Sequence, residues 1–433
     1  MNTAVIHDGY PPDQSSASLQ KRVWLSCVTG SLITWYDFMI FNIATAMVFA
    51  PLFFTDMTYL IPMLVFAVGF LSRPLGSVIF GYLGDRFGRR NTLVWTLLLT
   101  GCSTVAIGLL PTYEQIGAAA GIALFVLRVL QTAAVGGEWA AASSMMHEYN
   151  QASKNRGFLA SLLSNGLFVS LWLAGSLFAF LTSFGNEAFL SWGWRIPFLI
   201  SALLIVVGVY TRLRVLESQD FRDYLDGLDQ RRPTPLRDLT VNHWRTIIPA
   251  ALLSVPSSAW NYGIFVFGVG YIIKEGLGTR PDITATQATM WFVAIWAMFL
   301  WGWLSDRVEP LKMWIVALLG GIVFAYPMIS ALSQGDIVVP MLIALLTSNL
   351  AFALSPAFYP KLFPVSVRQS GAGITYNLGL LIGGGITPVA LTWVTSIRGN
   401  IFDAVWVFVA IGIIGLVSAI HLLRQQNLEQ SSQ

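Results

Sequence analysis

The sequence predicts an all-α membrane protein of twelve transmembrane helices arranged in two six-helix halves. Of its 433 residues, 55% are hydrophobic and 11% are charged, whereas a soluble domain carries roughly a quarter charged residues. Twelve apolar runs are each long enough for a helical span, which needs about 20 residues. The runs lack the alternating pattern of a membrane β-barrel, so a helix bundle is predicted.

Six of these runs make up the first half, and the short loops between them make consecutive helices antiparallel neighbours. We place them near residues 24–49, 60–82, 91–110, 115–146, 157–184 and 193–213. A polar segment follows, in which apolar residues recur at helical spacing before two prolines break the pattern. These are Phe221, Tyr224, Leu225 and Leu228, then Pro233 and Pro235. The segment is interpreted as a surface helix that links two halves.

Six further runs form the second half, near residues 247–273, 285–303, 311–332, 337–359, 367–394 and 401–423. The chain therefore divides into five parts. They are an N-terminal tail (1–22), a first bundle (23–213), a linker (214–245), a second bundle (246–423) and a C-terminal tail (424–433).

Basic residues predict the orientation in the membrane. If the N-terminus is cytoplasmic, most of the 25 Lys and Arg residues fall on the cytoplasmic side. On the opposite face the loops hold only Lys274, Arg280 and Arg398. Since cytoplasmic loops carry an excess of Lys and Arg, both termini are expected in the cytoplasm of a bacterial cell, with the chain in its inner membrane.

One short charged turn joins the second and third runs and occurs twice. Residues 81–90 read GYLGDRFGRR, and the same position of the second half reads GWLSDR at 302–307. An internal repeat at this place is typical of two related six-helix bundles. Charges at helix ends suit a gate between the bundles, so we predict as gating residues Asp85, Arg86, Arg89, Arg90, Asp306 and Arg307.

The turn at 81–90 resembles the G-x-L-x-D-R-x-G-R-R loop of major facilitator superfamily transporters. Five further stretches resemble one branch of it, the metabolite:H⁺ symporters of organic acids and compatible solutes. They are GSLITWYDF (30–38), GFLSRPLG (69–76), QTAAVGGEW (131–139), WGWRIPF (192–198) and KLFPVSVR (361–368). Three positions depart from the family pattern: Thr34 and Lys361 replace Glu, and Thr132 replaces Gly. The resemblance implies the major facilitator fold and transport by alternating access.

Four ionisable residues lie at membrane depth: Asp37, Arg73, Arg128 and Glu138. Such groups cost several kcal/mol unless they are paired or wet, so they are candidates for function. We expect Arg73 and Arg128 to hold an anion and Asp37 to carry the coupled proton, with Asp37 paired to an arginine. Glu138 is the second proton candidate or part of a gate salt bridge. The alternative is purely structural pairing for Arg73 and a helix–helix hydrogen bond for Asp37.

Aromatic and amide residues are the other candidates for contact with substrate. They are Trp35, Trp260, Asn261, Tyr262, Tyr376 and Asn377. Hydrogen bonding to substrate competes here with bonding to a neighbouring helix, which is the commoner use of such groups in spans.

Composition also excludes other classes of function. The net charge of +3 is small and spread over loops, which argues against a nucleic-acid partner. Neither a Ser/His/Asp nor a Cys/His arrangement is present, so we expect no enzyme, no metal and no cofactor. The sequence predicts a monomeric secondary transporter in the lipid bilayer that takes up a small organic anion with protons. Alternatives are an exporter of a metabolite or amphiphile, uptake of a zwitterionic compatible solute and, more remotely, a non-transporting sensor.

Overall fold

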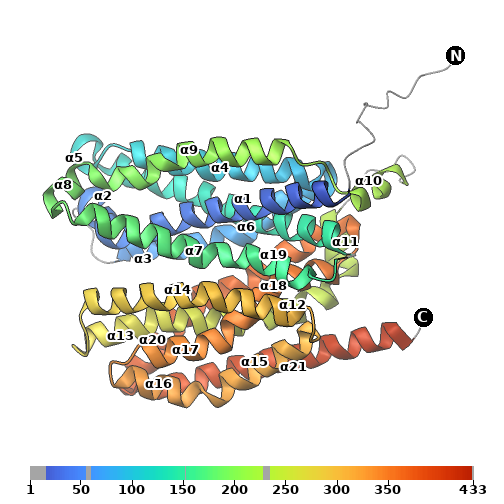
Figure 1. Ribbon diagram of the computed structural model, residues 1–433. Helices are drawn as coiled ribbons and strands as arrows, with labels where there is room; N and C mark the ends of the chain where they lie inside the picture. Colours follow the sequence, from blue (N-terminus) through green and yellow to red (C-terminus); the bar gives the residue numbers. More distant parts are fainter. Residues whose placement is uncertain (1–15, 55–59, 152, 228–234, 432–433) are drawn as a thin grey trace.

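The computed structural model describes residues 16–54, 60–151, 153–227 and 235–431, and nearly all of them are helical. Parts of both predicted tails and of the linker, including Leu228 and Pro233, lie outside the described residues. The long helices form two groups that lie side by side (Figure 1). The first group contains α1 (Ser16–Ala44), α3 (Leu60–Phe87), α4 (Arg89–Leu109), α6 (Ala118–Asn150), α7 (Arg156–Thr182) and α9 (Ile196–Leu213).

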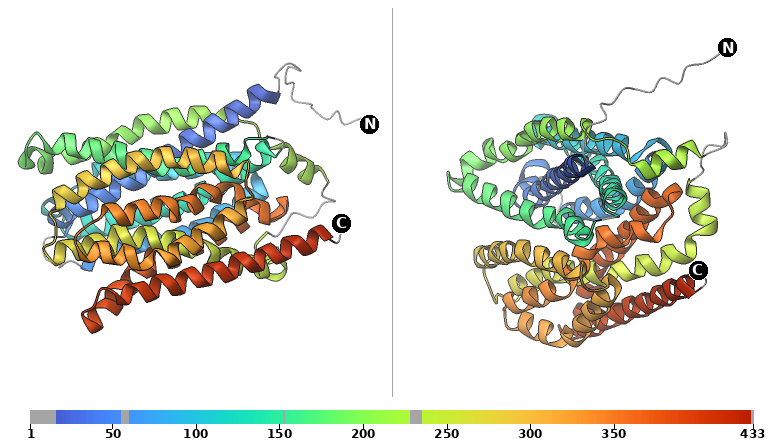
Figure 2. Two further views of the ribbon diagram at one scale, coloured as in Figure 1. Left: turned by 60° about the horizontal axis from the view of Figure 1, so that its bottom comes forward. Right: turned by 45° about the vertical axis from the view of Figure 1, so that its right-hand side comes forward.

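The second group contains several spans made of two helical pieces. Its members are α12 (Trp244–Tyr262), α13 (Val269–Lys274), α14 (Arg280–Ser305), α15 (Pro310–Val323), α16 (Ala325–Ser333), α17 (Val338–Leu346), α18 (Ser348–Phe358), α19 (Arg368–Leu380), α20 (Thr387–Arg398) and α21 (Asp403–Ser431). Short helices at the ends are α2 (Ala50–Phe53), α5 (Tyr113–Ile116) and α8 (Asn186–Ser191). Two further views confirm that the groups are stacked on each other (Figure 2).

Ten helical segments of the described chain are long and apolar enough to cross a membrane. The bent pair α15 and α16, which meet at 46°, makes an eleventh. Helix α3 is not among these segments but lies in the same bundle (Figure 1), so the described chain is consistent with the twelve spans that the sequence predicts. The first span begins earlier than predicted, at Ser16, and continues after Ala44 as a π-helical turn.

Both α1 and α21 have their terminal ends at the same end of the bundle (Figure 1). We call this the basic end; here α3 meets α4, α6 meets α7 and α14 meets α15. The linker also lies at this end, and its structure corrects the prediction of one surface helix. It holds two, α10 (Gln219–Asp226) and α11 (Pro235–Asn242). Pro235 begins a helix because proline lacks only an N–H that the first turn leaves unbonded anyway.

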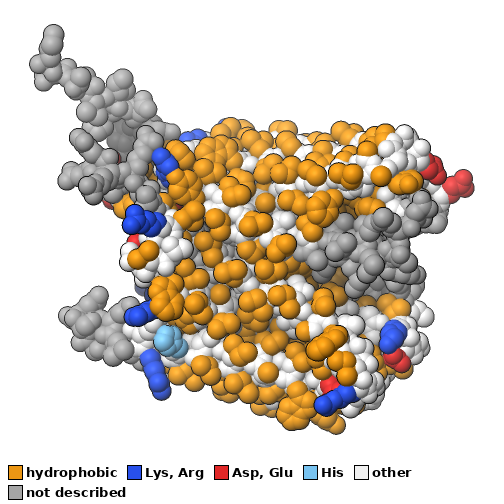
Figure 3. Space-filling model, turned by 180° about the vertical axis from the view of Figure 1, so that it is seen from behind, with side chains coloured by type: hydrophobic (Ala, Val, Ile, Leu, Met, Phe, Trp, Pro, Cys, Tyr) orange, Lys and Arg blue, Asp and Glu red, His pale blue; other side chains and the backbone are white. Residues whose placement is uncertain are grey.

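Large apolar side chains cover the outside of the bundle. Leu203 on α9, Trp393 on α20 and Trp406 on α21 are each more than 60% exposed. Figure 3 shows hydrophobic side chains over the middle of one face, with most of the visible charges near its two ends. In water such a surface would drive aggregation, whereas in a bilayer it faces lipid of matching polarity.

Small residues bring α3 and α6 into close contact at the centre of the first group. A Cβ atom on Gly136 would lie 2.2 Å from the main-chain oxygen of Arg73, and one on Gly76 would lie 1.8 Å from that of Ala133. Only glycine permits this approach. The crossing therefore fixes the position of the Arg73 backbone on α3.

Candidate substrate-binding site and gate

Arg73 lies at the interface between the two groups of helices and is almost fully buried. Its Nε donates a hydrogen bond to Oδ1 of Asn377 on α19, 3.1 Å away. Its Nη1 and Nη2 atoms have no hydrogen-bond partner among the described residues. The guanidinium lies 5.2 Å from the ring centre of Trp35 and 5.5 Å from that of Phe38. Two buried donors of a cation thus remain unsatisfied, which is costly.

Arg128 on α6 lies on the same aromatic ring. Its guanidinium carbon is 4.6 Å from the ring centre of Phe38 and 3.9 Å from that of Phe41. Its hydrogen bonds go to neutral amides, Oε1 of Gln131 at 2.7 Å and Oδ1 of Asn42 at 2.6 Å. No ion pair of the described residues involves Arg73 or Arg128. The sequence-predicted pair of cations therefore lies around Phe38 without a direct ion pair, and Glu138 is an acid that interacts with Arg73 at longer range.

The ion pair that was expected between Asp37 and an arginine is not formed among the described residues. One oxygen of its carboxyl group accepts a hydrogen bond from Ser201 on α9 at 2.5 Å, and Oδ2 has no partner among the described residues. Gln131 stands between Asp37 and Arg128. Its Nε2 donates to the main-chain oxygen of Asp37 at 3.2 Å and to Thr104 at 2.8 Å. Its Oε1 accepts a hydrogen bond from Arg128. Gln131 thus connects Arg128 to the main chain at Asp37, not to its carboxyl group.

Glu138 forms an ion pair, but within one group of helices. Its carboxylate lies 2.7 Å from Nη2 of Arg212 on α9, and both side chains are buried. Because α6 and α9 belong to the same group, this pair does not span the interface that a gate must open. Arg212 is therefore the buried counter-ion of Glu138.

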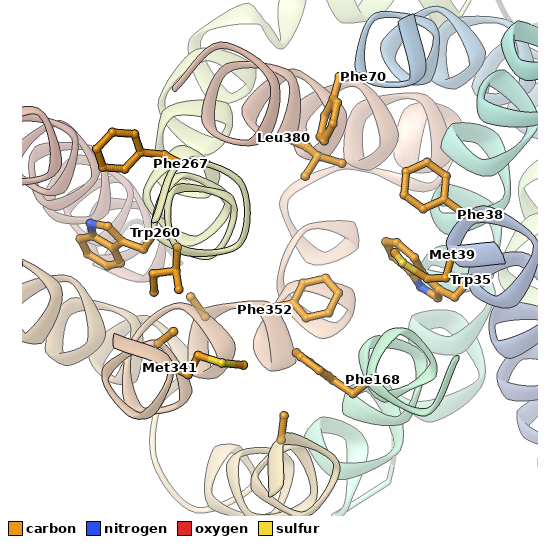
Figure 4. Packing of buried hydrophobic residues seen from close by; sticks show 14 of the residues in the cluster. Trp35, Phe38, Met39, Phe70, Phe168, Trp260, Phe267, Met341, Phe352 and Leu380 are labelled. Carbon is orange, nitrogen blue, oxygen red and sulfur yellow. The ribbon is translucent and has the colours of Figure 1, made fainter. Parts of the chain in front are cut away.

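Aromatic residues from both groups surround Arg73. The Trp139 ring of α6 stacks on the Tyr376 ring of α19 at 3.8 Å, and Phe70 of α3 meets Tyr262 of α12 edge to face at 5.1 Å. Tyr376, Tyr262 and Glu138 all lie near Arg73. Figure 4 shows Trp35, Phe38 and Phe70 of the first group facing toward Phe352 and Leu380 of the second. The predicted residues Trp35, Tyr262 and Tyr376 thus come together near Arg73.

Asn377 also occupies this interface. Besides accepting from Arg73, it donates to Ser77 on α3 at 2.9 Å and to the main-chain oxygen of Gly136 on α6 at 3.3 Å. One amide of the second group thereby holds both crossing helices of the first. This contact must change whenever the two groups separate here.

Two predicted substrate residues lie elsewhere. The Trp260 ring packs against Gly321 and Gly412 in the second group, and Figure 4 shows it on the side of its helix away from Trp35 and Phe38. Asn261 donates to the main-chain oxygen of Ser257 in its own helix at 3.2 Å. Trp260 Nε1 and Asn261 Oδ1 are buried without a hydrogen-bond partner among the described residues. We leave both residues out of the candidate site, because no contact joins either of them to Arg73 or Arg128 among the described residues.

The basic end is closed by two matching contacts across the interface. The carboxylate of Asp85 on α3 accepts hydrogen bonds from the main-chain N–H groups of Gln369 and Ser370 at the start of α19, at 3.1 and 2.8 Å. Asp306, its counterpart in the second half, accepts from the main-chain N–H groups of Gly157 and Phe158 at the start of α7, at 2.6 and 3.0 Å. Each acid thus caps a helix of the opposite group, where the positive end of the helix dipole favours it.

A buried charge cluster supports the first of these caps. Arg89 lies 3.4 Å from Asp85 and 3.3 Å from Glu148 and donates to the main-chain oxygen of Val365 at 2.7 Å. Glu148 also pairs with Arg368 of the second group at 2.9 Å. The linker joins here, because the guanidinium of Arg89 lies 4.2 Å from the Phe221 ring of α10.

The other predicted gating residues do not cross the interface. Arg86 bonds Tyr82 in its own helix, and Arg307 bonds the main-chain oxygen of Trp303 in its own helix. Arg90 bonds the main-chain oxygen of Leu213, and its N–H donates to the Glu217 carboxylate at 3.1 Å. Burial raises the pKa of Glu217, and the charge of Arg89 opposes this rise.

Sequence reasoning missed several residues that carry these contacts: Asn42, Gln131, Glu148, Ser201 and Arg212. Gln131 offered a signal, because it lies three residues after Arg128 and such residues share a helix face. The partners of Glu148 and Arg212 come from distant segments of the chain. Only the packed structure shows these pairings.

The fold and the interface define the class of this protein: a polytopic membrane protein with two similar helical groups, buried charges between them and a closed gate at one end. The model of the Major Facilitator Superfamily matches residues 28–375. The chain therefore belongs to this family, whose members are transporters and not enzymes. The expectations of family and fold class are confirmed.

Relatives and solved structures agree with this assignment. The chain is 31% identical to the shikimate transporter of Escherichia coli (strain K12), over 97% of this chain and 98% of the relative. It is 29% identical to the glycine betaine/proline/ectoine/pipecolic acid transporter OusA of Dickeya dadantii (strain 3937), over 94% and 84%. The crystal structure of the proton:xylose symporter XylE bound to 6-bromo-6-deoxy-D-glucose has the same fold, with a TM-score of 0.73 at 14% identity over 95% and 96%.

Proposed function

We propose that this chain takes up a small organic anion together with protons. The observation that carries the proposal is the pair of buried guanidinium groups around Phe38, which form no direct ion pair with a described residue. A substrate carboxylate at this place would accept from Nη1 and Nη2 of Arg73, the two donors without a partner. A forked donor holds a carboxylate through two parallel hydrogen bonds, which gives orientation as well as affinity.

Charge favours an anion over a zwitterion at this site. The substrates in the two relatives' names include shikimate, an anion, and glycine betaine and proline, which are zwitterions; all carry a carboxylate. A zwitterion would leave both positive charges of Arg73 and Arg128 without net compensation, whereas an anion neutralises one. The rings of Trp35 and Phe38 could bind a quaternary ammonium group. The guanidinium of Arg73 already lies over both rings.

Proton coupling is assigned to Asp37. Its Oδ2 is buried without a partner, which suits a carboxyl group that gains and loses a proton. Gln131 bonds Arg128 and also Thr104, which lies beside the Asp37 carboxyl group, so the acid and the anion site share these neighbours. Glu138 is the second candidate and is already paired with Arg212.

Localisation and assembly are proposed on the same basis. The chain is an integral membrane protein, and we place its basic end and both termini in the cytoplasm because most basic loops lie there. The residue boundaries of the two bundles, 23–213 and 246–423, and a monomeric state belong to the same proposal. Export remains the alternative direction of transport.

The test is a binding screen on the purified protein by thermal stability. A ligand at a hundredfold excess over its Kd stabilises by about 2.7 kcal/mol, so a true substrate is visible. Shikimate and succinate are compared with glycine betaine and proline, and the uncharged methyl ester of shikimate is the matched control. We expect stabilisation by an anion and none by the ester. Stabilisation by betaine alone would favour the zwitterion alternative, and an equal effect of acid and ester would contradict the anion site.

A further inference from the structure

A second group of cations lies at the basic end, away from the proposed substrate site. A cavity of about 360 Å³ opens there between the two groups of helices. Its walls come from α6 and α7 on one side and from α15, α18 and the segment before α19 on the other. This volume falls in the range of roughly 300–1,000 Å³ typical of small-molecule sites.

Positive charge dominates the wall of this cavity. Arg156 at the start of α7 and Lys361 after α18 both line it, and neither forms an ion pair with a described residue. Arg368 also lines it but is neutralised by Glu148. The acid on the wall, Glu309, pairs with Lys312 at 3.1 Å. The two free cations therefore set the charge of the cavity.

His147 shows that these cations act on one place. It lines the cavity and has no hydrogen-bond partner among the described residues. Three cations, Arg368, Arg156 and Lys361, all interact with it electrostatically, and the acid Glu148, which pairs with Arg368, opposes them. Cations from α7 and from the second group thus converge on one small volume.

We propose that this cavity is a binding site for a small multivalent anion that carries phosphate or carboxylate groups. Arg156 supplies a forked donor and Lys361 a point charge, from opposite groups of helices. Lys361 stands where the family pattern has Glu, so the chain has changed the sign of the charge at this wall. The site is independent of the proposed function, because it shares no residue with the Arg73 site.

The site has a consequence for the transport cycle. Since its walls come from both groups, separation of the groups at the basic end pulls Arg156 and Lys361 apart. An anion therefore binds the closed state better, and by linkage it holds the basic end closed. A cytoplasmic anion at this site would slow turnover without competing for the substrate.

The test is direct binding of pyrophosphate to the full chain in phosphatidylcholine nanodiscs, at constant ionic strength. We expect saturable binding that Arg156→Gln and Lys361→Gln each weaken by about tenfold, the usual effect of losing one charge-assisted hydrogen bond. Lys361→Glu should weaken it further. Lys154→Gln removes a charge from the same loop outside the cavity wall and should leave binding unchanged.

Both substituted side chains are exposed, so the variants should fold, and their melting temperatures check this. Nanodiscs with phosphatidylglycerol distinguish the source of the anion. If a lipid headgroup occupies the site, phosphatidylglycerol should weaken pyrophosphate binding more in the wild type than in Lys361→Gln. If phosphatidylglycerol weakens pyrophosphate binding equally in the wild type and in Lys361→Gln, the site is assigned to a soluble anion. The proposal would be overturned if the wild type showed no saturable pyrophosphate binding. It would also be overturned if Arg156→Gln and Lys361→Gln both bound pyrophosphate with wild-type affinity.

Discussion

Arg73 is a buried cation with one hydrogen bond to a neutral amide and two unsatisfied donors. Arg128, which faces the other aromatic rings nearby, is bonded only to amides. Their environment is therefore incomplete in electrostatic terms, while Glu138 and Arg212 a short distance away neutralise each other. For this reason we assign Arg73 and Arg128 to substrate binding, and Glu138 and Arg212 to the stability of the fold.

Replacement of Arg73 tests that assignment at the residue scale. Arg73→Ala removes a charge-assisted contact worth about 1.5–3 kcal/mol, so the Kd for an anionic substrate should rise by roughly 10- to 100-fold. Arg73→Lys keeps the charge but loses the fork and should also weaken binding.

The matched control for Arg73→Lys is Arg195→Lys. Arg195 donates to the main-chain oxygens of Gly108 and Leu110, outside the candidate site. Binding is measured by titration of the purified proteins with the best ligand of the screen. Wild-type affinity in both Arg73 variants would remove Arg73 from the site.

At the scale of elements, the crossing of α3 and α6 holds Arg73 in place. Gly136→Ala would put a methyl group 2.2 Å from the Arg73 main-chain oxygen. Such overpacking costs about 1–3 kcal/mol, so the apparent melting temperature should fall. Gly270→Ala is the control, because nothing lies within 4 Å of the added Cβ. Equal melting temperatures of Gly136→Ala and Gly270→Ala would show that α3 and α6 are not packed as tightly as described.

A second prediction at this scale concerns the two carboxylates, Asp85 and Asp306, that cap helices at the basic end. Asp85→Asn and Asp306→Asn each remove a negative charge from the N-terminus of a helix in the opposite group. Charge and dipole interactions of this kind are worth about 0.3–2 kcal/mol, enough to shift the balance between closed and open states. Each variant should slow transport severalfold and leave the substrate Kd near the wild-type value.

The control for the caps is Asp282→Asn, because Asp282 lies in the first turn of its own helix α14 and bonds only Thr279 nearby. Uptake rates and Kd values are measured side by side. A loss of affinity equal to the loss of rate would assign Asp85 to folding of the site rather than to motion.

The spans could be predicted from sequence because about 20 apolar residues at a stretch have few other structures open to them. The loop at Asp85 and its copy at Asp306 were recognisable because residue type and spacing repeat. The spacing of Arg128 and Gln131 indicated their contact within α6, but the bonds of Gln131 to Asp37 and Thr104 could not be predicted, since they depend on the packing of α6 on α1 and α4. The second linker helix was missed because Pro235 was interpreted as the end of a helix, whereas it begins one.

At the scale of the whole molecule, the two groups of helices contact each other at the basic end and around Arg73. The basic end is closed by Asp85, Asp306 and the cluster around Glu148. The proposed anion site at Arg73 lies on the same interface, where Asn377 bridges the groups. Opening of the basic end must therefore break these contacts together, which is how binding and release can alternate between the two sides of a membrane.

The most direct measurement is uptake of the screened anion into proteoliposomes with and without an imposed pH gradient, acidic outside. The account predicts that the wild type accumulates the anion above its outside concentration only when the gradient is present. Asp37→Asn should lose this accumulation but still exchange labelled for unlabelled anion, because exchange needs the site and no net proton release. Accumulation by the wild type that ignores the gradient, or gradient-driven accumulation by Asp37→Asn at the wild-type level, would contradict the account.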